Sequence, residues 1–288
     1  MKKLSRREFI GQGARGLGAM LVLSQLPLGS MANGTIAYKH PVGFQTYPIR
    51  DLVAKDFAGT MKMMAGMGYQ LVEMCYPVGY ADAGFAPLVN VKPEDLRRII
   101  YDAGLYCPSC HYGIRDLTDN LDKSIEYAHG LGLTQMVCPG LDVRENTVSA
   151  YKEAADKYNK IAEKIKSAGM VTALHNENKE FSMIEGQLIY DVIMSELDGN
   201  LVKMQFQTAV VNLGYQAITY FNKYPGRFIS AHLSDWTADK KQVPIGQGVI
   251  DWKEFFAAAK TAGIKNFFVE MKLENYKDSA TYIHGLLG

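Results

Sequence analysis

Four polar side chains interrupt apolar, strand-like runs in the second half of the chain. They are His175, Gln207, His232 and Glu270. Burying such a group without a partner costs free energy, so each needs a reason to be there. Two imidazoles, an amide and a carboxylate can hold a divalent metal or transfer a proton. A lone buried histidine is more often a satisfied core residue, but four interruptions in successive runs favour a shared site.

Short β-rich runs and helical segments alternate along the chain and must position these residues. The β-rich runs predict strands at 42–47, 70–76, 105–112, 134–139, 171–176, 202–208, 228–234 and 266–272. Apolar residues at three- and four-residue spacing predict helices that include 93–103, 121–131, 148–168, 188–197 and 252–262. Glycines that can adopt the left-handed conformation follow the helices: Gly68, Gly104, Gly132, Gly169, Gly199, Gly226 and Gly263. Asp56 and Asp251 are expected N-caps, and Pro93 suits a first helical turn.

Eight strands, each followed by a helix, predict an α/β fold: a single-domain (βα)₈ TIM barrel. The alternative is an open, doubly wound sheet, which normally carries a glycine-rich phosphate loop after an early strand. Here the first strand ends in Tyr47-Pro48-Ile49-Arg50, without glycine. In a barrel the carboxyl ends of the strands carry the chemistry, so the four polar residues are expected to converge there.

The N-terminus is typical of an export signal. Arg6-Arg7, framed by Ser5 and Phe9, resembles a twin-arginine motif, and a short apolar segment and small residues follow it. That segment is shorter than the roughly 20 apolar residues that span a bilayer. We therefore predict a twin-arginine signal peptide at 1–32, a barrel at 33–288, a periplasmic or otherwise exported location, and no membrane attachment after signal removal.

The composition argues against nucleic acid as a partner. The formal net charge is +1, and no basic cluster occurs outside the signal.

Around the four polar residues the chain resembles the xylose isomerase-like TIM barrels, known as sugar phosphate isomerases/epimerases. The resemblance covers essentially all of 42–288. It rests on His175-Asn176-x-x-x-Glu180-Phe181, on Lys223-Tyr224-Pro225-Gly226-Arg227-Phe228 leading into His232-Leu233-x-Asp235, on Gly246-x-Gly248-Val249-Ile250-Asp251-Trp252, and on Phe268-Val269-Glu270.

The resemblance implies a divalent metal, often manganese, at the ends of strands five to eight. Carried across, its ligands are His175, Gln207, His232 and Glu270. This chain departs from the pattern at two of them: Gln207 replaces the usual Asp, and His175 stands where Glu is common. An amide oxygen is a weaker ligand than a carboxylate for a hard cation. Two imidazoles and one carboxylate remain, a set that can bind transition metals.

The family's chemistry removes a proton next to a carbonyl of a small carbohydrate. Glu270 is the expected base, and Glu177 is a candidate second base. Lys272 shares a strand face with Glu270 by two-residue alternation, where it would stabilise an oxyanion or, without a metal, pair with Glu270. With one clear base, a lyase, hydratase or keto-glycoside-cleaving reaction is an alternative. A non-catalytic sugar-binding barrel is another, since Gln207 can mark a lost metal site.

Polar residues on the other strands are candidates for substrate binding. They are Gln45, Glu73, His111 and Asp235, with Arg50 beside the end of the first strand. An internal hydrogen bond is an equally good explanation for Gln45, Glu73 and His111. The oligomeric state does not follow from the sequence, although barrels of this kind often pair, which allows a homodimer.

The cysteines raise a rival from another class. Cys107-Pro108-Ser109-Cys110-His111 fits the c-type haem attachment pattern. However, the segment is predicted to be a buried barrel strand, which leaves no room for haem. A Cys107–Cys110 disulfide is awkward because residues three apart on a strand face opposite sides. We expect these cysteines, and Cys75 and Cys138, to be small packing residues with free thiols.

Overall fold

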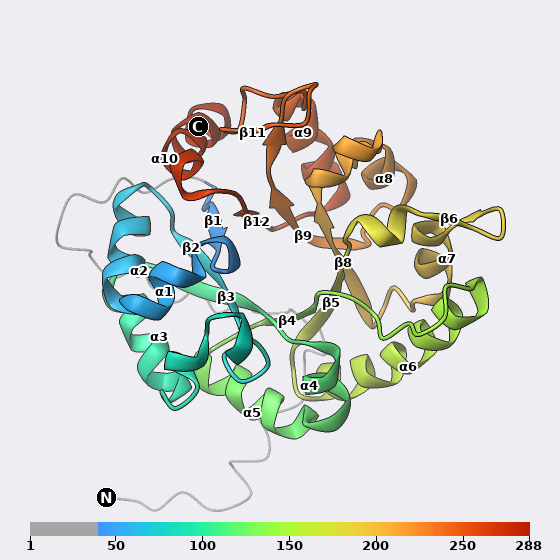
Figure 1. Cartoon of the computed structure of the whole chain (residues 1–288), viewed down its shortest axis with the longest axis horizontal. Helices are drawn as coiled ribbons and strands as arrows, with labels where there is room; N and C mark the ends of the chain where they lie inside the picture. Colours follow the sequence, from blue (N-terminus) through green and yellow to red (C-terminus); the bar gives the residue numbers. More distant parts are fainter. Residues whose placement is uncertain (1–39) are drawn as a thin grey trace, which may run out of the picture. The chain divides into compact units, whose positions relative to one another are not determined.

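Eight parallel strands close into a barrel in the computed structural model, which describes residues 40–288 (Figure 1). The predicted signal peptide and its cleavage site lie outside the described residues. Around the barrel the strands follow the order β1-β12-β9-β8-β5-β4-β3-β2. The single-domain (βα)₈ barrel predicted from the alternation of strands and helices is therefore confirmed, and the doubly wound alternative is wrong. Within 40–288, no helix combines the length and hydrophobicity needed to cross a membrane.

The barrel strands agree with the predicted runs to within a few residues. They are β1 (Gly43–Gln45), β2 (Leu71–Cys75), β3 (Tyr106–His111), β4 (Gln135–Cys138), β5 (Val171–His175), β8 (Val202–Gln207), β9 (Phe228–Leu233) and β12 (Asn266–Val269). The largest difference is in β12, which ends three residues before the predicted boundary. Lys272 therefore does not belong to the strand, and the alternation argument that paired it with Glu270 was wrong.

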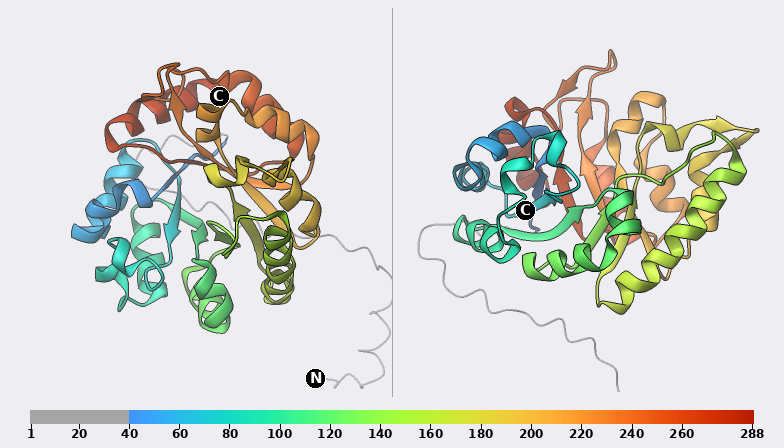
Figure 2. Two further views of the ribbon diagram at one scale, coloured as in Figure 1. Left: turned by 45° about the vertical axis from the view of Figure 1, so that its right-hand side comes forward. Right: turned by 60° about the horizontal axis from the view of Figure 1, so that its bottom comes forward.

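The helices form an outer ring around the strands (Figures 1 and 2). They are α1 (Arg50–Lys55), α2 (Phe57–Gly66), α3 (Pro93–Asp102), α4 (Ile114–Asp119), α5 (Leu121–Leu131), α6 (Val148–Ser167), α7 (Ile189–Glu196), α8 (Ala217–Lys223), α9 (Trp252–Ala262) and α10 (Tyr276–Leu287). Asp56 and Asp251 cap α2 and α9 as predicted, because their carboxylates accept from Gly59 N and Glu254 N.

Six of the seven predicted cap glycines adopt positive φ, and Gly199 does not. A Cβ at Gly199 would lie 2.8 Å from the Arg227 side chain, so close packing accounts for that glycine instead.

Two short hairpins and several 3₁₀ turns extend the loops that follow the strands. The hairpins are β6 (Met183–Ile184) with β7 (Gln187–Leu188), and β10 (Asp235–Trp236) with β11 (Gln242–Val243). The 3₁₀ turns are η1 (Tyr47–Ile49), η2 (Ala81–Ala83), η3 (Ala86–Leu88), η4 (Asn178–Phe181), η5 (Thr208–Leu213) and η6 (Leu273–Asn275).

An aromatic cluster anchors the loop after β5. The ring of Phe181, at the end of η4, stacks on Tyr190 with centroids 4.6 Å apart and meets Tyr220 edge-on at 5.2 Å. All three rings are buried. Burying an aromatic side chain of this size contributes on the order of 1.5–3 kcal/mol. The cluster therefore fixes η4, and with it the residues that follow His175.

Candidate active site at the carboxyl ends of the strands

Three buried histidines meet inside the barrel. His111, His175 and His232 come from the carboxyl ends of β3, β5 and β9, and their ring centroids lie 4.7 to 5.3 Å apart. Each offers one ligand nitrogen within 4.8 Å of the other two. The expected convergence of His175 and His232 is thus present, and His111, predicted to contact substrate, joins them.

Glu73 on β2 lies beneath the histidines and has no exposed surface. Its Oε1 accepts from Ser109 Oγ at 2.6 Å and from Gln205 Nε2 at 2.8 Å. Its Oε2 lies 2.5 Å from His232 Nε2 and 3.2 Å from His111 Nε2. Burial raises the pKa of Glu73, but the two histidines outweigh it and hold that pKa well below 4.5. Glu73 is therefore a buried anion that orients two imidazoles, and it does not reach a substrate directly.

His232 is clamped between two carboxylates. Its Nε2 faces Glu73, and its Nδ1 lies 2.9 Å from Glu270 Oε2. Burial lowers the pKa of His232, but the negative charges of Glu270 and Glu73 prevail and raise it from 6.5 to about 10. Both ring nitrogens therefore carry protons at neutral pH, and His232 is an imidazolium.

Gln205 on β8 fixes the orientation of the other two histidines. Its Nε2 donates to Glu73 and to Ser230 Oγ, so its oxygen faces His111 Nε2 at 2.7 Å and His175 Nδ1 at 3.0 Å. Because a carbonyl oxygen only accepts, both of those nitrogens must be N–H donors. Burial lowers the pKa of His175, which favours its neutral form. The other nitrogen of His175, Nε2, faces Glu177.

The chemistry of this donor set fits a transition metal. Neutral imidazole is a common ligand, and a hydrogen bond to its other nitrogen is the usual way a protein orients it. His111, His175 and His232 would hold the ion, and Gln205 supplies the outer hydrogen bonds. His232 carries protons on both ring nitrogens, so binding a metal through it is expected to release a proton.

Glu270 connects the cluster to an open cleft. Oε2 accepts from His232 and also from Gln207 Nε2 at 2.5 Å, whereas no described residue donates to Oε1. The side chain is 19% exposed, while that of His232 is fully buried. Burial raises the pKa of Glu270, but the charge of His232 outweighs it and lowers the pKa to about 2. Glu270 is thus a carboxylate with one oxygen facing the cleft.

Gln207 has a different role from the predicted one. Its Oε1, the atom a metal would need, accepts from Ala209 N at 3.2 Å and caps η5. Its Nε2 is used to orient Glu270. In this structure Gln207 positions the carboxylate, and His111 takes its place among the candidate ligands.

Glu177 stands at the start of η4, beside the histidines. A capping box joins it to Glu180, whose Oε2 accepts from Glu177 N at 2.8 Å. Its Oε1 lies 3.6 Å from His175 Nε2, and its side chain is 59% exposed. Burial raises the pKa of Glu177, but the contact with His175 outweighs it and lowers that pKa, while the charge of Glu270 raises it. Glu177 and Glu270 are therefore close enough to act on each other.

Two other predicted residues lie apart from the histidines. Gln45 is buried at the end of β1, where its amide contacts Cys75 Sγ at 3.5 Å and accepts from Tyr47 N. Asp235 is also buried, and its Oδ2 accepts from Gly246 N, Gly248 N and Trp252 Nε1. Asp235 organises the loop before α9, and the structure does not bring it to the cluster.

The sequence reading missed Ser109, Gln205 and Ser230. Each lies two residues before a strand-end polar residue: His111, Gln207 or His232 respectively. Side chains two apart on a strand point to the same face, so the alternation was a usable signal for a second polar layer.

The four cysteines are buried and free. Burial raises the pKa of Cys107 and that of Cys138 to about 12, so both are neutral thiols. Cys107 and Cys110 lie within β3, packed in the core, and the haem hypothesis was wrong. The expectation of free thiols that pack the strands is confirmed.

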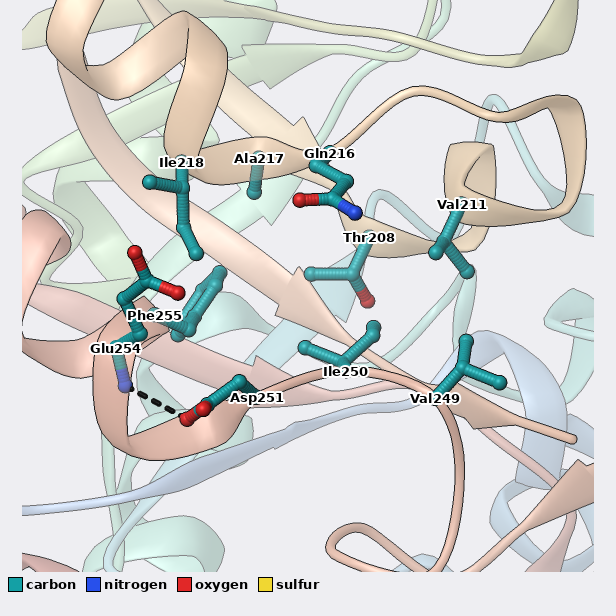
Figure 3. A pocket seen from close by; sticks show the side chains of 10 residues that line it. All are labelled: Thr208, Val211, Gln216, Ala217, Ile218, Val249, Ile250, Asp251, Glu254 and Phe255. Carbon is teal, nitrogen blue, oxygen red and sulfur yellow. Dashed lines mark hydrogen bonds between the residues drawn. The ribbon is translucent and has the colours of Figure 1, made fainter.

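A cleft lies above Glu270, and it is larger than a second cavity near this end of the barrel. It encloses about 770 Å³ and is lined by Gln207, Glu270 and Lys272, among others. A smaller one of about 180 Å³ lies between η5 and the starts of α8 and α9 (Figure 3). Its acidic residues are Asp251, which caps α9, and Glu254. None of the clustered histidines lines either cavity, but Glu270, which contacts His232, lines the larger one, so that cleft is the candidate active site.

A comparison against known families identifies the barrel. The model of the xylose isomerase-like TIM barrel matches residues 61–286. The chain belongs to this family. No match was found among curated proteins.

Solved structures share the fold at low sequence identity. A sugar phosphate isomerase/epimerase from Parabacteroides distasonis is 23% identical with a TM-score of 0.72, over 88% of this chain and 96% of its own. An L-ribulose 3-epimerase is 16% identical with a TM-score of 0.66, over 86% and 94%. The protein IOLI, solved with a zinc atom, is 15% identical with a TM-score of 0.62, over 86% and 95%.

Proposed function

We propose that this chain is an enzyme that isomerises or epimerises a carbohydrate by removing a proton next to a carbonyl. The observation that carries the proposal is the pair of carboxylates, Glu177 and Glu270, beside a buried histidine cluster at the mouth of the barrel. Two carboxylates around one substrate carbon allow a proton to be taken from one face and returned to the other. The names of the structural neighbours, an L-ribulose 3-epimerase among them, support the same reaction class.

Glu270 is the proposed base. Its Oε1 faces the cleft, while His232 and Gln207 hold Oε2. A carboxylate with a pKa of about 2 is a weak base, since proton transfer works best when the pKa lies near the operating pH. The reaction therefore depends on cations that stabilise the developing enediolate and so make the substrate carbon more acidic.

Two sources of positive charge serve that purpose in the proposal. Lys272 lines the same cleft as Glu270 and stabilises the oxyanion. A divalent metal on the three histidines would polarise the substrate carbonyl as a Lewis acid. Zinc and manganese are the ions to test, the first because a structural neighbour carries zinc. Substrate held against Glu270 would displace water from the cleft and strengthen these interactions.

An elimination or hydration reaction on the same barrel is the second candidate. Glu177 is far more exposed than Glu270, and its contact with His175 is 3.6 Å long. If Glu177 does not reach the substrate, Glu270 acts alone, and one base suffices to start an elimination. Cleavage of a keto-glycoside begins with the same proton abstraction. The exported location predicted from the N-terminus favours a free or glycosidically linked sugar as substrate.

Deuterium uptake from D₂O tests the shared first step. The protein is loaded separately with zinc and with manganese and incubated with a panel of keto-sugars and disaccharides. Enzyme-dependent deuterium at the carbon next to the carbonyl supports the proposal. Glu270→Gln should reduce uptake by about 10²–10⁴-fold, the usual contribution of a general base. Glu274→Gln, at an exposed position outside the cleft, is the matched control.

The products separate the candidates. An isomer or epimer that carries deuterium identifies the first function, and loss of water or of a glycoside identifies the second. Sugar binding without any exchange, with either metal, would contradict both and leave a binding protein. Full exchange activity in Glu270→Gln would show that another residue is the base.

A further inference from the structure

Four cations are among the residues that line the cleft above Glu270: Arg50, Lys240, Lys241 and Lys272. We call these four residues the cationic wall. Glu270 is the one carboxylate among the lining residues. Its Oε2 is already engaged with His232 and Gln207, so little negative charge remains to balance the wall. The whole chain carries a formal net charge of only +1, so the cleft concentrates positive charge locally.

Most of the cationic wall has no acidic partner. Lys241 pairs with Asp239 at 2.7 Å, on the exposed tip of the hairpin. No carboxylate among residues 40–288 forms an ion pair with Arg50, Lys240 or Lys272. Three unpaired cations and one exposed pair remain available to a ligand in the cleft.

The fold brings the cationic wall together from three separate loops. Arg50 begins α1, directly after β1 and η1. Lys240 and Lys241 lie in the turn of the β10–β11 hairpin, and Lys272 follows β12. β1 and β12 are neighbours in the barrel. Gln242 joins the other two loops, because its Oε1 accepts from Lys272 N at 2.8 Å.

Local contacts hold the individual side chains and turns. Arg50 Nη1 donates to Tyr47 O at 2.9 Å, and its guanidinium lies over the Tyr47 ring, 4.7 Å from the centroid. Lys240 has φ of 62°, and its N donates to Thr237 O at 2.9 Å to close the hairpin turn. An oriented guanidinium is well suited to an anion with two or three oxygens.

We propose that the substrate carries a negatively charged group, and that the cationic wall binds this group while Glu270 faces the reacting carbon. The group is a carboxylate, as in a uronic acid, or a sulfate or phosphate ester, all of which present several acceptor oxygens to these cations. The proposal rests on the function proposed above, because it names the substrate class of the same cleft. It adds substrate binding as a role for Lys240. For Arg50, which the sequence placed beside the candidate substrate-binding residues, it adds an anionic group as the ligand.

Binding measurements on the full-length protein test the charge preference without relying on turnover. Isothermal titration compares D-glucuronate, D-galacturonate and D-mannuronate with their neutral parent hexoses. Glucose 6-sulfate and glucose 6-phosphate are the ester arms. We expect at least one acidic sugar to bind about tenfold or more tightly than its parent, the amount that one or two charge-assisted hydrogen bonds supply. The preference should shrink as salt is raised from 50 to 500 mM, concentrations chosen to span strong screening.

Variants then assign the preference to the wall. Arg50→Gln and Lys240→Gln should each weaken the acidic ligand about three- to tenfold and leave the neutral hexose unchanged. Lys123→Gln, at an exposed position of α5, is the control and should change neither. Thermal melting of each variant checks that it is folded.

The outcomes distinguish this proposal from the proposed function. If every acidic sugar binds no better than its parent, or both variants weaken neutral and acidic ligands equally, the charged substrate is ruled out. Salt-sensitive binding of an acidic sugar without deuterium exchange supports the charged substrate and contradicts the proposed reaction. The ligand class that binds most tightly, among the carboxylates, the sulfate ester and the phosphate ester, identifies the charged group.

Discussion

His232 and Glu73 form an ion pair without exposed surface, with Nε2 2.5 Å from Oε2. Taking two charges out of water costs several kcal/mol per ion, and only close contact with further hydrogen bonds offsets that cost. Both partners have such bonds. Glu73 accepts hydrogen bonds from Ser109 and Gln205, and His232 also contacts Glu270. The result is a carboxylate–imidazolium–carboxylate chain that leads from inside the barrel to the cleft.

Glu73→Gln should strongly destabilise the fold. The substitution leaves the His232 cation with one partner instead of two, and removing one member of a buried pair typically costs about 3–5 kcal/mol. Chemical denaturation measures the change in the free energy of unfolding. Glu126→Gln, at an exposed position of α5, should stay within about 0.5 kcal/mol of the unmodified protein. A loss below about 1 kcal/mol for Glu73→Gln would contradict a charged pair.

The charges of His232 and Glu270 should stabilise the metal-free protein most between about pH 4.5 and 6.5, whereas His175, whose pKa burial lowers, favours the folded state above 6.5. His232 has a folded pKa raised from 6.5 to about 10, so its stabilisation is complete below 6.5 and is lost as pH rises through 10. Glu270 has a folded pKa lowered from 4.5 to about 2, so its stabilisation is complete above 4.5 and is lost as pH falls through 2. The groups that set the His232 value are Glu270 and Glu73.

Denaturation with a chelator present, from pH 5 to 9.5, checks the alkaline side of this window. His232→Gln should remove most of the decline in unfolding free energy above pH 6.5. An equal decline in both proteins would mean that His232 is not charged when folded.

The polar residues at the strand ends were predictable because they interrupt apolar runs. The layer of the barrel in which each of them lies was not predictable. Glu73 and His111 were expected to contact substrate, yet Glu73 is fully buried and His111 is a candidate metal ligand. The stagger between neighbouring strands sets the layer in which a side chain lies. The sequence of a single strand does not reveal that stagger. Here the register places Glu73 beside Ser109, and Gln205 beside His175 and Ser230.

Tertiary contacts also ended β12 earlier than its sequence suggests. Glu270 N still donates to Leu233 O on β9, as a strand residue would. Two residues later, Lys272 N donates to the Gln242 side chain of the β10–β11 hairpin. A side chain thirty positions away thus redirects the backbone, which local propensity does not reveal. Lys272 nevertheless lines the cleft beside Glu270, as expected on different grounds.

Metal affinity should depend on His175 and much less on Gln207. His175 offers a ring nitrogen beside those of His111 and His232, whereas the Gln207 oxygen is engaged with Ala209 N. Losing an outer hydrogen bond to a ligand typically costs about 10–100-fold in metal affinity, so losing the ligand itself should cost at least about 100-fold. His175→Ala should therefore lose zinc and manganese, and Gln207→Ala should stay within about threefold, less than that outer-shell cost.

Competition with a chromophoric chelator measures both affinities. If Gln207→Ala lost as much metal affinity as His175→Ala, Gln207 would be a metal ligand. The metal affinity of Gln205→Leu should lie between those of the two other variants, because the substitution removes the acceptor that orients His111 and His175.

Gly248→Ala should loosen the hairpin that carries part of the cationic wall. A Cβ at Gly248 would lie 2.1 Å from the Asp235 carboxylate and 2.5 Å from the Trp236 carbonyl oxygen. Backbone and a buried carboxylate cannot yield easily, so the substitution should destabilise the protein by about 1–3 kcal/mol. It should also weaken acidic-sugar binding, since Asp235 anchors the base of the hairpin through Gly246 and Gly248.

Gly66→Ala should change the stability of the protein in the opposite direction and serves as a comparison. Gly66 is the exposed last residue of α2, with open space around its Cβ position, so alanine should stabilise the fold by about 0.4–1 kcal/mol. Thermal melting measures the difference between the two variants. If Gly248→Ala were as stable as the unmodified protein and kept its acidic-sugar preference, Asp235 would not be what anchors the hairpin.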